Sequence, residues 1–477
     1  MKKVILSFLF LSFLFSSCSA PTYIVTYLDS DGKVIEVVAN VSNLEEAKER
    51  NNYKEGYIFK GWESEIQGNN VTLVAQYEDI EEIVINTTLP AIYGVGAYPV
   101  TYKYRSDYFV QDNTVFNKDL AYLSLGAACF NRDNGTLVKN LVRELGFIDI
   151  YQTEDTYQET SKDSVAYTLA HKKIGREEVI LLSIRGSGYY REWESNITIG
   201  EEGEHEGFYN SALQVYSGLK TYINNLNNKK IKLWLTGFSR GAAICSLFID
   251  YMMQEENRLF ADDSIYAYCF EGPVFSDHII DYPFLKRIIN HNDLVGTINV
   301  PRWGFVEQPY IDIYSQYGDE YYAEFTGHNI STIPNISETY EEIIDLLTSS
   351  YPCLSNRQDG SEFLKEVAYI VGLLLSSDEV LFGLADTILD KSVSELLSYL
   401  TTNKLYRDLS ALLDEYAIEY DNSKLEESIS HVLTTLVSNK SFIDLVRLIR
   451  HSASSIAYNH YPEYIHSLLL HYEDYNN

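Results

Sequence analysis

The chain has 477 residues, with 68 Asp and Glu against 37 Lys and Arg, and a formal net charge of -31. This acidic balance is spread along the chain and excludes a nucleic-acid-binding protein, because phosphates require basic patches. The length exceeds that of one compact domain, so two or three domains are expected.

The first 18 residues have the organisation of an export signal. Two lysines precede an apolar run over residues 4–15, which is shorter than the ~20 residues that span a bilayer. The run ends in Ser16, Ser17 and Cys18, which resembles a bacterial lipobox and implies lipidation of Cys18. Phe15 stands where leucine is usual, so cleavage by an ordinary signal peptidase is the alternative. We expect an exported protein that is either lipid-anchored at the cell membrane or extracellular.

Residues 22–77 form the first folded unit that the sequence predicts. Two β-rich runs, 23–28 and 33–39, flank an Asp- and Gly-containing turn at 29–32, which is typical of a hairpin. The segment 56–62 and the strand 71–77 follow, and here the unit resembles the internalin B-repeat family of β-grasp-like surface modules. That resemblance implies a spacer or adhesion role. Residues 78–98, with Pro90, Gly94 and Gly96, are predicted to be a linker.

Residues 99–477 are predicted to form an α/β domain. Helical patterns at 117–130 and 136–145 come first, and a hairpin around Gly175 joins the strands 165–171 and 179–184. Short apolar strands at 231–236, 265–270 and 286–290 then alternate with helix-length segments. This alternation favours a largely parallel sheet with helices on both faces.

A Gly-x-Ser-x-Gly turn at residues 237–241 follows the strand 231–236 and precedes a helix that begins with small residues. This is the context that a nucleophile elbow requires, so Ser239 is the candidate nucleophile. An oxyanion hole needs the N–H of the next residue, Arg240, and a second donor from an earlier strand end. The strand 179–184 leads into Ser187, which is the candidate for that second donor.

Four motifs in order resemble class 3 lipases, a branch of the α/β-hydrolases. They are residues 185–187, 192–196, 205–208 and the serine elbow, within a resemblance that covers about residues 100–310. The resemblance implies an α/β-hydrolase fold, an esterase or lipase activity, and a lid at residues 189–204. His205 precedes the elbow, so we interpret it as a packing residue.

The catalytic acid and base should follow the serine in that order. Asp293 follows a short apolar strand and matches the family's Asn-x-x-Asp-x-Val pattern; Asp277 and Asp281 are the alternatives. His460 lies just before a helix whose first turn holds Pro462, where proline is favoured. His328 is the alternative base.

If His460 is the base, residues 337–450 are a helical insertion between acid and base. Apolar residues recur there at helical spacing. Such a block either packs against the sheet domain or caps the active site. His466 and His471 lie in the last helix and are interpreted as structural.

The resulting hypothesis is a surface-anchored serine hydrolase that cleaves an acyl ester or lipid through Ser239, His460 and Asp293. No metal or cofactor is implied, and contact with the cell surface or membrane would come through the lipid anchor. The remaining cysteines, at 129, 245, 269 and 353, are interpreted as small buried residues rather than disulfides. The alternative is a non-catalytic surface adhesion protein on a hydrolase scaffold.

Overall fold

The computed structural model describes residues 22–91, 97–131, 134–153, 157, 164–187, 190–227, 230–374, 380, 384 and 391–472. Cys18 and the expected export signal lie outside these residues. The chain divides into two compact units, one comprising residues 1–81 with 173–177 and the other the remainder.

In its described residues, 22–81, the N-terminal unit is a four-stranded sheet in the order β2-β1-β4-β3 with one helix. Strand β1 is parallel to β4, while β2 and β3 pair antiparallel at the two edges. At the turn between β1 and β2, Gly32 has φ +83°, a conformation that favours glycine. The elements are β1 Tyr23–Leu28, β2 Val34–Val41, α2 Leu44–Glu49, β3 Tyr57–Gln67 and β4 Asn70–Asp79.

The prediction of a linker over residues 78–98 is wrong for its central part. Residues Glu82–Pro90 form strand β5, which pairs antiparallel along its whole length with β6, Ala97–Arg105. Ile85 and Leu89 point into the core and are buried. The proline and glycines at the end of the segment obscured this period-2 pattern, in which the buried residues lie an even number of positions apart.

The second unit is built on a mixed seven-stranded sheet in the order β13-β12-β11-β10-β9-β8-β7. Strands β9 to β13 are parallel to one another, and β7 pairs antiparallel with β8. The strands are β7 Ile148–Gln152, β8 Tyr167–Ile174, β9 Glu177–Ile184, β10 Ile231–Phe238, β11 Ile265–Phe270, β12 Leu285–Ile289 and β13 Ile311–Asp312. The expected α/β sheet with crossover helices is therefore present.

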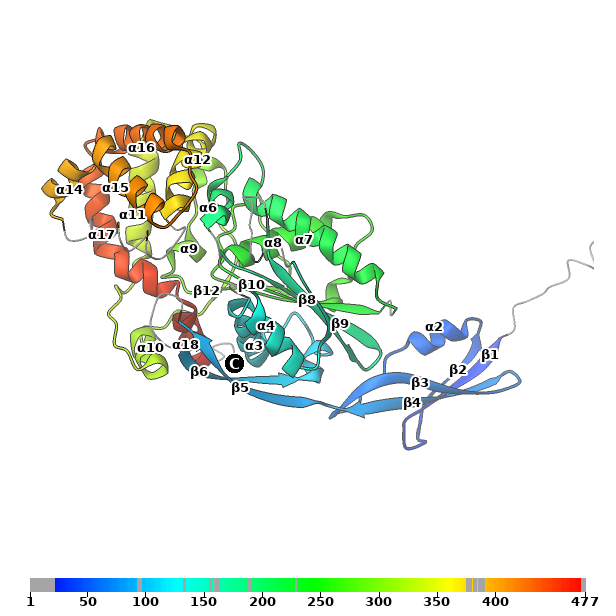
Figure 1. Ribbon diagram of the computed structural model, residues 1–477. Helices are drawn as coiled ribbons and strands as arrows, with labels where there is room; N and C mark the ends of the chain where they lie inside the picture. Colours follow the sequence, from blue (N-terminus) through cyan, green and yellow to red (C-terminus); the bar gives the residue numbers. More distant parts are fainter. Residues whose placement is uncertain are drawn as a thin grey trace, which may run out of the picture. The chain divides into compact units, whose positions relative to one another are not determined.

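Helices cover both faces of this sheet (Figure 1). Helices α3, Lys118–Cys129, and α4, Thr136–Glu144, lie on one face, and α7, Glu206–Asn224, with α8, Arg240–Gln254, lie on the other. Strands β9 to β11 read as nearly continuous apolar runs because both of their faces are buried. This burial holds the carboxyl end of β10 in a fixed place, and that is where Ser239 lies.

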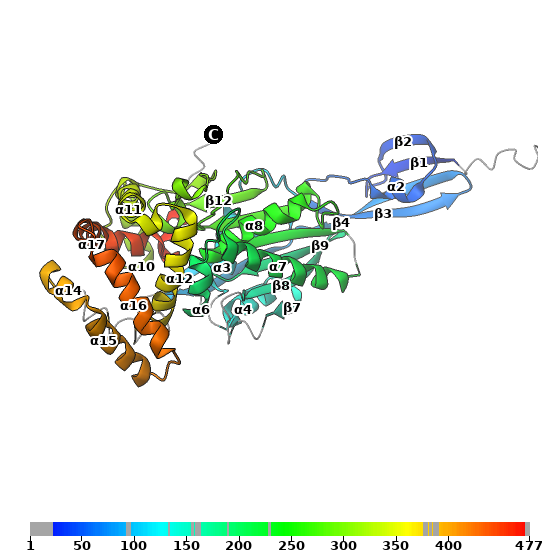
Figure 2. The ribbon, with the colours of Figure 1, turned by 90° about the horizontal axis from the view of Figure 1, so that it is seen from above.

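Most of the helices after residue 337 form a cluster at one end of the sheet (Figure 2). They have an apolar core of their own, to which Tyr340, Phe363, Leu409, Ile429 and Leu445 contribute. The described helices of this cluster are α11 Ser337–Ser350, α12 Arg357–Leu374, α14 Val393–Tyr399, α15 Thr402–Glu415, α16 Asn422–Val437 and α17 Phe442–Asn459.

The predicted end of the helical insertion at residue 450 is too early. Helix α17 continues without a break to Asn459, because the first residue that interrupts the helical pattern is Pro462, at the start of α18, Pro462–His471. The last helix of the insertion therefore ends directly before His460. In the part of the chain that the structure describes, no helix combines the length and apolarity that a membrane crossing needs.

Candidate active site

Ser239 occupies the sharp turn between β10 and α8. Its backbone has φ 55° and ψ -125°, a strained conformation for a residue with a side chain. The Ser239 N–H donates to the Phe270 carbonyl at 2.9 Å, which ties the turn to the neighbouring strand β11. The turn thus carries the hydroxyl out of the sheet, as a nucleophile elbow requires.

The glycines of this turn are needed for space. A Cβ on Gly237 would come within 2.5 Å of the Gly241 backbone, and a Cβ on Gly241 would come within 2.4 Å of the Ile184 carbonyl oxygen. Real side chains do not tolerate such distances. The strand and the helix can therefore approach this closely only with glycine at both positions.

Two hydrogen bonds connect Ser239, His460 and Asp293. The His460 Nε2 atom lies 2.9 Å from Ser239 Oγ, and its Nδ1 atom lies 2.6 Å from Asp293 Oδ2. Asp293 is fully buried, whereas Ser239 and His460 are partly exposed. The imidazole thus bridges a buried carboxylate and a hydroxyl that solvent can reach, as in a Ser-His-Asp arrangement.

Each of the three side chains is held by its local structure. Asp293 is the N-cap of the short helix α9, Leu294–Thr297, and its Oδ1 accepts from the Val295 N–H at 2.9 Å. His460 is the C-cap of α17, one residue before the N-cap of α18. Tyr340 of the helical insertion donates to the Asn292 carbonyl at 3.1 Å and so supports the loop of the acid.

The candidate oxyanion residues flank Ser239. Arg240 is the first residue of α8, so its N–H is among those at a helix start that have no intrahelical partner. Gly186 lies against the turn, since a Cβ there would meet the Phe238 carbonyl at 2.9 Å. Ser187 follows, and its hydroxyl accepts from Asn196 Nδ2 at 2.7 Å, which leaves the Ser187 O–H proton available to donate.

The segment expected to be a lid contains helix α6, Tyr190–Ile197, and is bound to the core. Glu192 is completely buried and pairs with Arg185 at 2.9 Å, with the Arg240 guanidinium at 3.8 Å. Arg357 of α12 donates to five backbone carbonyls of residues 199–204. In this structure these contacts pack the described part of the segment against the core and against α12.

The alternative candidates lie elsewhere. His328 is exposed beside Tyr98, 6.5 Å between ring centroids, and Asp277 and Asp281 are exposed. The prediction of structural roles for His205 and His466 agrees with their surroundings. His205 caps α7 and stacks on Phe208, and burial lowers its pKa to about 3.

His466 lies in the core, where burial lowers its pKa to about 4. Its Nε2 atom is 2.9 Å from the Tyr102 hydroxyl, and its Nδ1 atom is 2.7 Å from the Pro462 carbonyl oxygen. Both ring nitrogens are therefore used within the fold.

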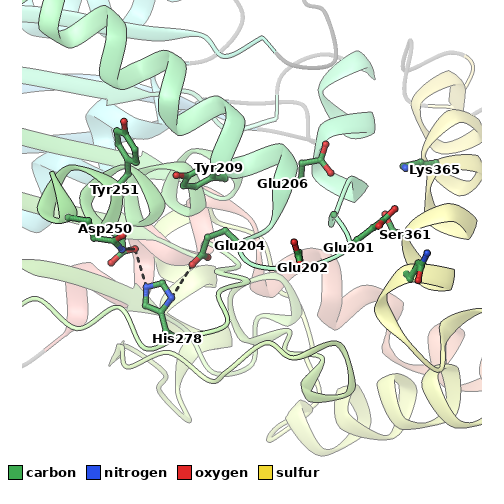
Figure 3. A pocket seen from close by; sticks show the side chains of 13 residues that line it. Glu201, Glu202, Glu204, Glu206, Tyr209, Asp250, Tyr251, His278, Ser361 and Lys365 are labelled. Carbon is green, nitrogen blue, oxygen red and sulfur yellow. Dashed lines mark hydrogen bonds and ion pairs between the residues drawn. The ribbon is translucent and has the colours of Figure 1, made fainter.

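A separate polar pocket of about 810 Å³ contains a histidine that the sequence did not single out (Figure 3). His278 lies between Asp250 at 3.1 Å from Nε2 and Glu204 at 3.1 Å from Nδ1, and Asp277 is 2.9 Å from Nδ1. Burial raises the pKa of Glu204 to about 7. Glu204, Asp277 and His278 could also offer ligands to a metal ion, but three carboxylates around one imidazole are equally suited to hold it protonated.

A second residue that the sequence analysis missed is Glu271, whose buried carboxyl group interacts with that of Asp293. It is completely buried at the end of the apolar strand β11. The only signal in the sequence is an acidic residue that immediately follows a run of buried residues, which does not reveal what it contacts.

Residues 181–302 match the family described as Lipase (class 3). The expected class 3 lipase-like ester hydrolase is thereby confirmed. The matched segment includes Ser239 and Asp293 and ends well before His460. The lipase-like chain has no match among curated proteins.

Three solved lipase structures are similar to part of the chain. The Rhizomucor miehei lipase in its propeptide complex is 19% identical over 40% of this chain and 67% of its own, with a TM-score of 0.30. The lipase of Rhizopus microsporus var. chinensis is 14% identical, over 41% and 74%, with a TM-score of 0.31. Lipase II of Rhizopus niveus is 15% identical, over 40% and 78%, with a TM-score of 0.31.

Proposed function

We propose that this lipase-like protein hydrolyses carboxylic esters through Ser239 as nucleophile, His460 as general base and Asp293 as the residue that orients the base. The observation that carries the proposal is the pair of hydrogen bonds on the His460 ring, 2.9 Å to Ser239 and 2.6 Å to Asp293. A nucleophile, a base and an orienting carboxylate in this geometry are the components of acyl transfer by a serine hydrolase.

In the first half of the reaction, the Ser239 oxygen attacks the ester carbonyl carbon while its proton moves to His460 Nε2. The carbonyl oxygen becomes an oxyanion, which the Arg240 N–H and Ser187 stabilise as donors. When the tetrahedral intermediate collapses, the bond to the alkoxy oxygen breaks, and His460 returns the proton to the departing alcohol. An acyl-enzyme on Ser239 remains.

In the second half, a water molecule gives its proton to His460 and attacks the acyl carbon. The carboxylic acid leaves, and the proton returns to Ser239. Asp293 keeps Nδ1 of His460 protonated throughout, so that Nε2 faces the serine as the acceptor. No step requires a cofactor.

We further propose that the protein is exported and acts at the cell surface. The charged, apolar and small-residue regions of residues 1–18 support export, and Cys18 is the proposed site of lipid attachment. The N-terminal unit is then a B-repeat-like spacer between the anchor and the hydrolase unit. Esters of lipids or of surface polymers near the membrane are the expected substrates. Metabolic labelling with a fatty acid, compared between the full chain and Cys18→Ala, tests the anchor; equal labelling would refute it.

The catalytic proposal is tested with a fluorophosphonate probe, which reacts with an activated serine. We expect wild-type protein to be labelled and to hydrolyse short-chain esters, and Ser239→Ala to lose both with an unchanged melting temperature. The loss in kcat should approach about 10⁶-fold, as for other serine nucleophiles. An unlabelled wild-type protein without ester turnover would instead favour the non-catalytic adhesion protein.

A panel of esters graded by acyl length then separates a lipase from a short-chain esterase. Preference for long acyl chains presented at an interface is expected of the former, and preference for soluble short-chain esters of the latter.

A further inference from the structure

Two carboxyl groups lie together in the core behind the proposed base. Glu271 and Asp293 are both 0% exposed, Glu271 at the end of β11 and Asp293 at the start of α9. Two adjacent carboxyl groups without a compensating cation do not both ionise in a buried site. The state of Glu271 therefore bears directly on the carboxylate that orients His460.

Among the described residues, one oxygen of Glu271 has a hydrogen-bond donor and the other has none. The Asn290 N–H donates to Oε1 at 2.8 Å. Among the described residues no donor reaches Oε2, which is buried. Oε2 lies against Gly296, where a Cβ would come within 2.9 Å of it, so the free oxygen faces the short helix that Asp293 begins.

Asp293 can accept a further hydrogen bond. Its Oδ1 accepts from the Val295 N–H and its Oδ2 faces the His460 ring, and each carboxylate oxygen has two lone pairs. A proton on Glu271 would supply the missing donor and satisfy both side chains. Without that proton, two buried acceptors would face each other.

The backbone at Glu271 indicates that this side chain is held in place by its surroundings. Its φ is +50°, in the left-handed region that glycine adopts at low cost. The Glu271 N–H donates to the Ile288 carbonyl at 3.1 Å, which fixes the residue between strands β11 and β12. The hydrogen bond from the Asn290 N–H then places its carboxyl group against the acid loop.

We propose that Glu271 is a positioning residue that stands behind Asp293 as a neutral carboxylic acid and donates a hydrogen bond to its carboxylate. The inference rests on the proposed Ser239–His460–Asp293 triad. Burial, the charge of Asp293 and a hydrogen bond to it raise the pKa of Glu271 well above its ordinary value. The donated hydrogen bond orients the carboxylate and disperses part of its negative charge.

The other charged and titratable groups near Glu271 are consistent with a neutral acid. Asp312 of β13 adds negative charge, although it pairs with His291 at 2.8 Å. Arg287 of β12 is the nearby cation, but its guanidinium donates to the carbonyls of Gly272 and Pro309. The charge of Arg287 does act on Glu271, but within the described part of the chain no ion pair joins the two. Tyr310 is a further titratable neighbour.

The test compares two variants of similar size. Glu271→Gln keeps a neutral donor, so kcat, KM and the pH profile should stay close to wild type. Glu271→Met removes the donor and also the acceptor of the Asn290 N–H, so the pH profile is the readout that separates a lost donor from a displaced loop. We expect its kcat to fall by about tenfold to a hundredfold with little change in KM, as for misplaced catalytic groups. The acid limb of kcat/KM should move to higher pH, because a more basic Asp293 stabilises protonated His460.

Two outcomes would overturn the proposal. If Glu271 is ionised in the native protein, Glu271→Gln removes a negative charge and moves the acid limb to lower pH. If Glu271 only fills space, Glu271→Met behaves as wild type.

An infrared difference spectrum tests the protonation of Glu271 even if Glu271→Met fails to fold. The carbonyl band of a protonated carboxyl group, present near neutral pH and lost in Glu271→Gln, is expected. It should persist in Ser239→Ala, which separates failure of this inference from failure of the triad. Absence of that band would show an ionised Glu271.

Discussion

Asn290 and Asn459 are joined by a side-chain hydrogen bond of 2.9 Å across 169 positions of sequence. Asn290 follows β12 and begins the loop of Asp293, and Asn459 ends α17 next to His460. Both amides are completely buried, and Asn459 also donates to the Ser455 carbonyl. The bond thus ties the loop of the acid to the helix that delivers the base.

Replacing Asn459 should therefore affect both rate and stability. Asn459→Ala leaves the Asn290 amide without its acceptor, which should cost about 1–3 kcal/mol of the free energy of unfolding. We also expect kcat to fall by about tenfold, since His460 loses its connection to the acid loop. Asn439→Ala is the matched control, because Asn439 donates to the Ser350 carbonyl within the helical insertion. It should lower stability only. An equal loss of kcat in both variants would contradict a role of the Asn290–Asn459 bond in positioning His460.

The two candidate bases can be separated by single substitutions. His460→Ala should lower kcat by several orders of magnitude, because a serine hydroxyl without its base is a weak nucleophile. His328→Ala should retain wild-type rates, since His328 is exposed and its ring lies against Tyr98, whereas the ring that contacts Ser239 is that of His460. Initial rates on a soluble ester measure both. Full activity of His460→Ala would exclude it as the base.

The N-terminal unit should be dispensable for turnover of a soluble ester. A protein that begins at Glu82 keeps strand β5 and should retain kcat/KM and cooperative melting. One that begins at Ala91 loses β5, and with it the burial of Ile85 and Leu89, worth about 1.5–3 kcal/mol for each side chain. Its melting temperature should be lower. Loss of activity in the well-folded Glu82 protein would show that the N-terminal unit contributes to the site.

Glu204 should make the protein less stable as the pH rises. Its pKa of about 7 in the folded state exceeds the ordinary value of 4.5, mainly because of burial. Between these values the folded protein holds a proton that the unfolded chain has released, so this contribution to stability falls as the pH increases from about 4.5 to 7. Burial lowers the pKa of His278, but nearby carboxylates raise it further, so that the net shift is upward. The contribution of His278 to the free energy of unfolding is therefore also lost with rising pH.

The measurement for Glu204 is the melting temperature across this pH window. Glu204→Gln should gain stability relative to wild type between pH 5 and 8, because the amide does not ionise. Glu206→Gln, an exposed substitution in the same segment, serves as the control and should follow wild type. A constant difference between Glu204→Gln and wild type over this range would show that Glu204 does not titrate there.

The sequence by itself determined the strand, the turn and the helix around Ser239. A strand of apolar residues, two glycines and a helix with small residues depend on neighbours within a few positions, so their pattern is visible locally. The same reasoning predicted Asp293 after a strand and His460 before Pro462, and the structure brings both within hydrogen-bonding distance of the expected partners. Strand β5 was not predicted, because Pro90, Gly94 and Gly96 indicated a linker and its alternating pattern is short.

Only the tertiary structure decided what supports these residues. The Asn290–Asn459 bond, the five carbonyls around Arg357 and the carboxyl group of Glu271 behind Asp293 join segments that are far apart in the chain. No local periodicity encodes such pairs, because each depends on which elements pack together and on how deeply they are buried. For the same reason the contacts of the expected lid segment were not predicted: the partners of Glu192 and of residues 199–204 come from other elements of the fold.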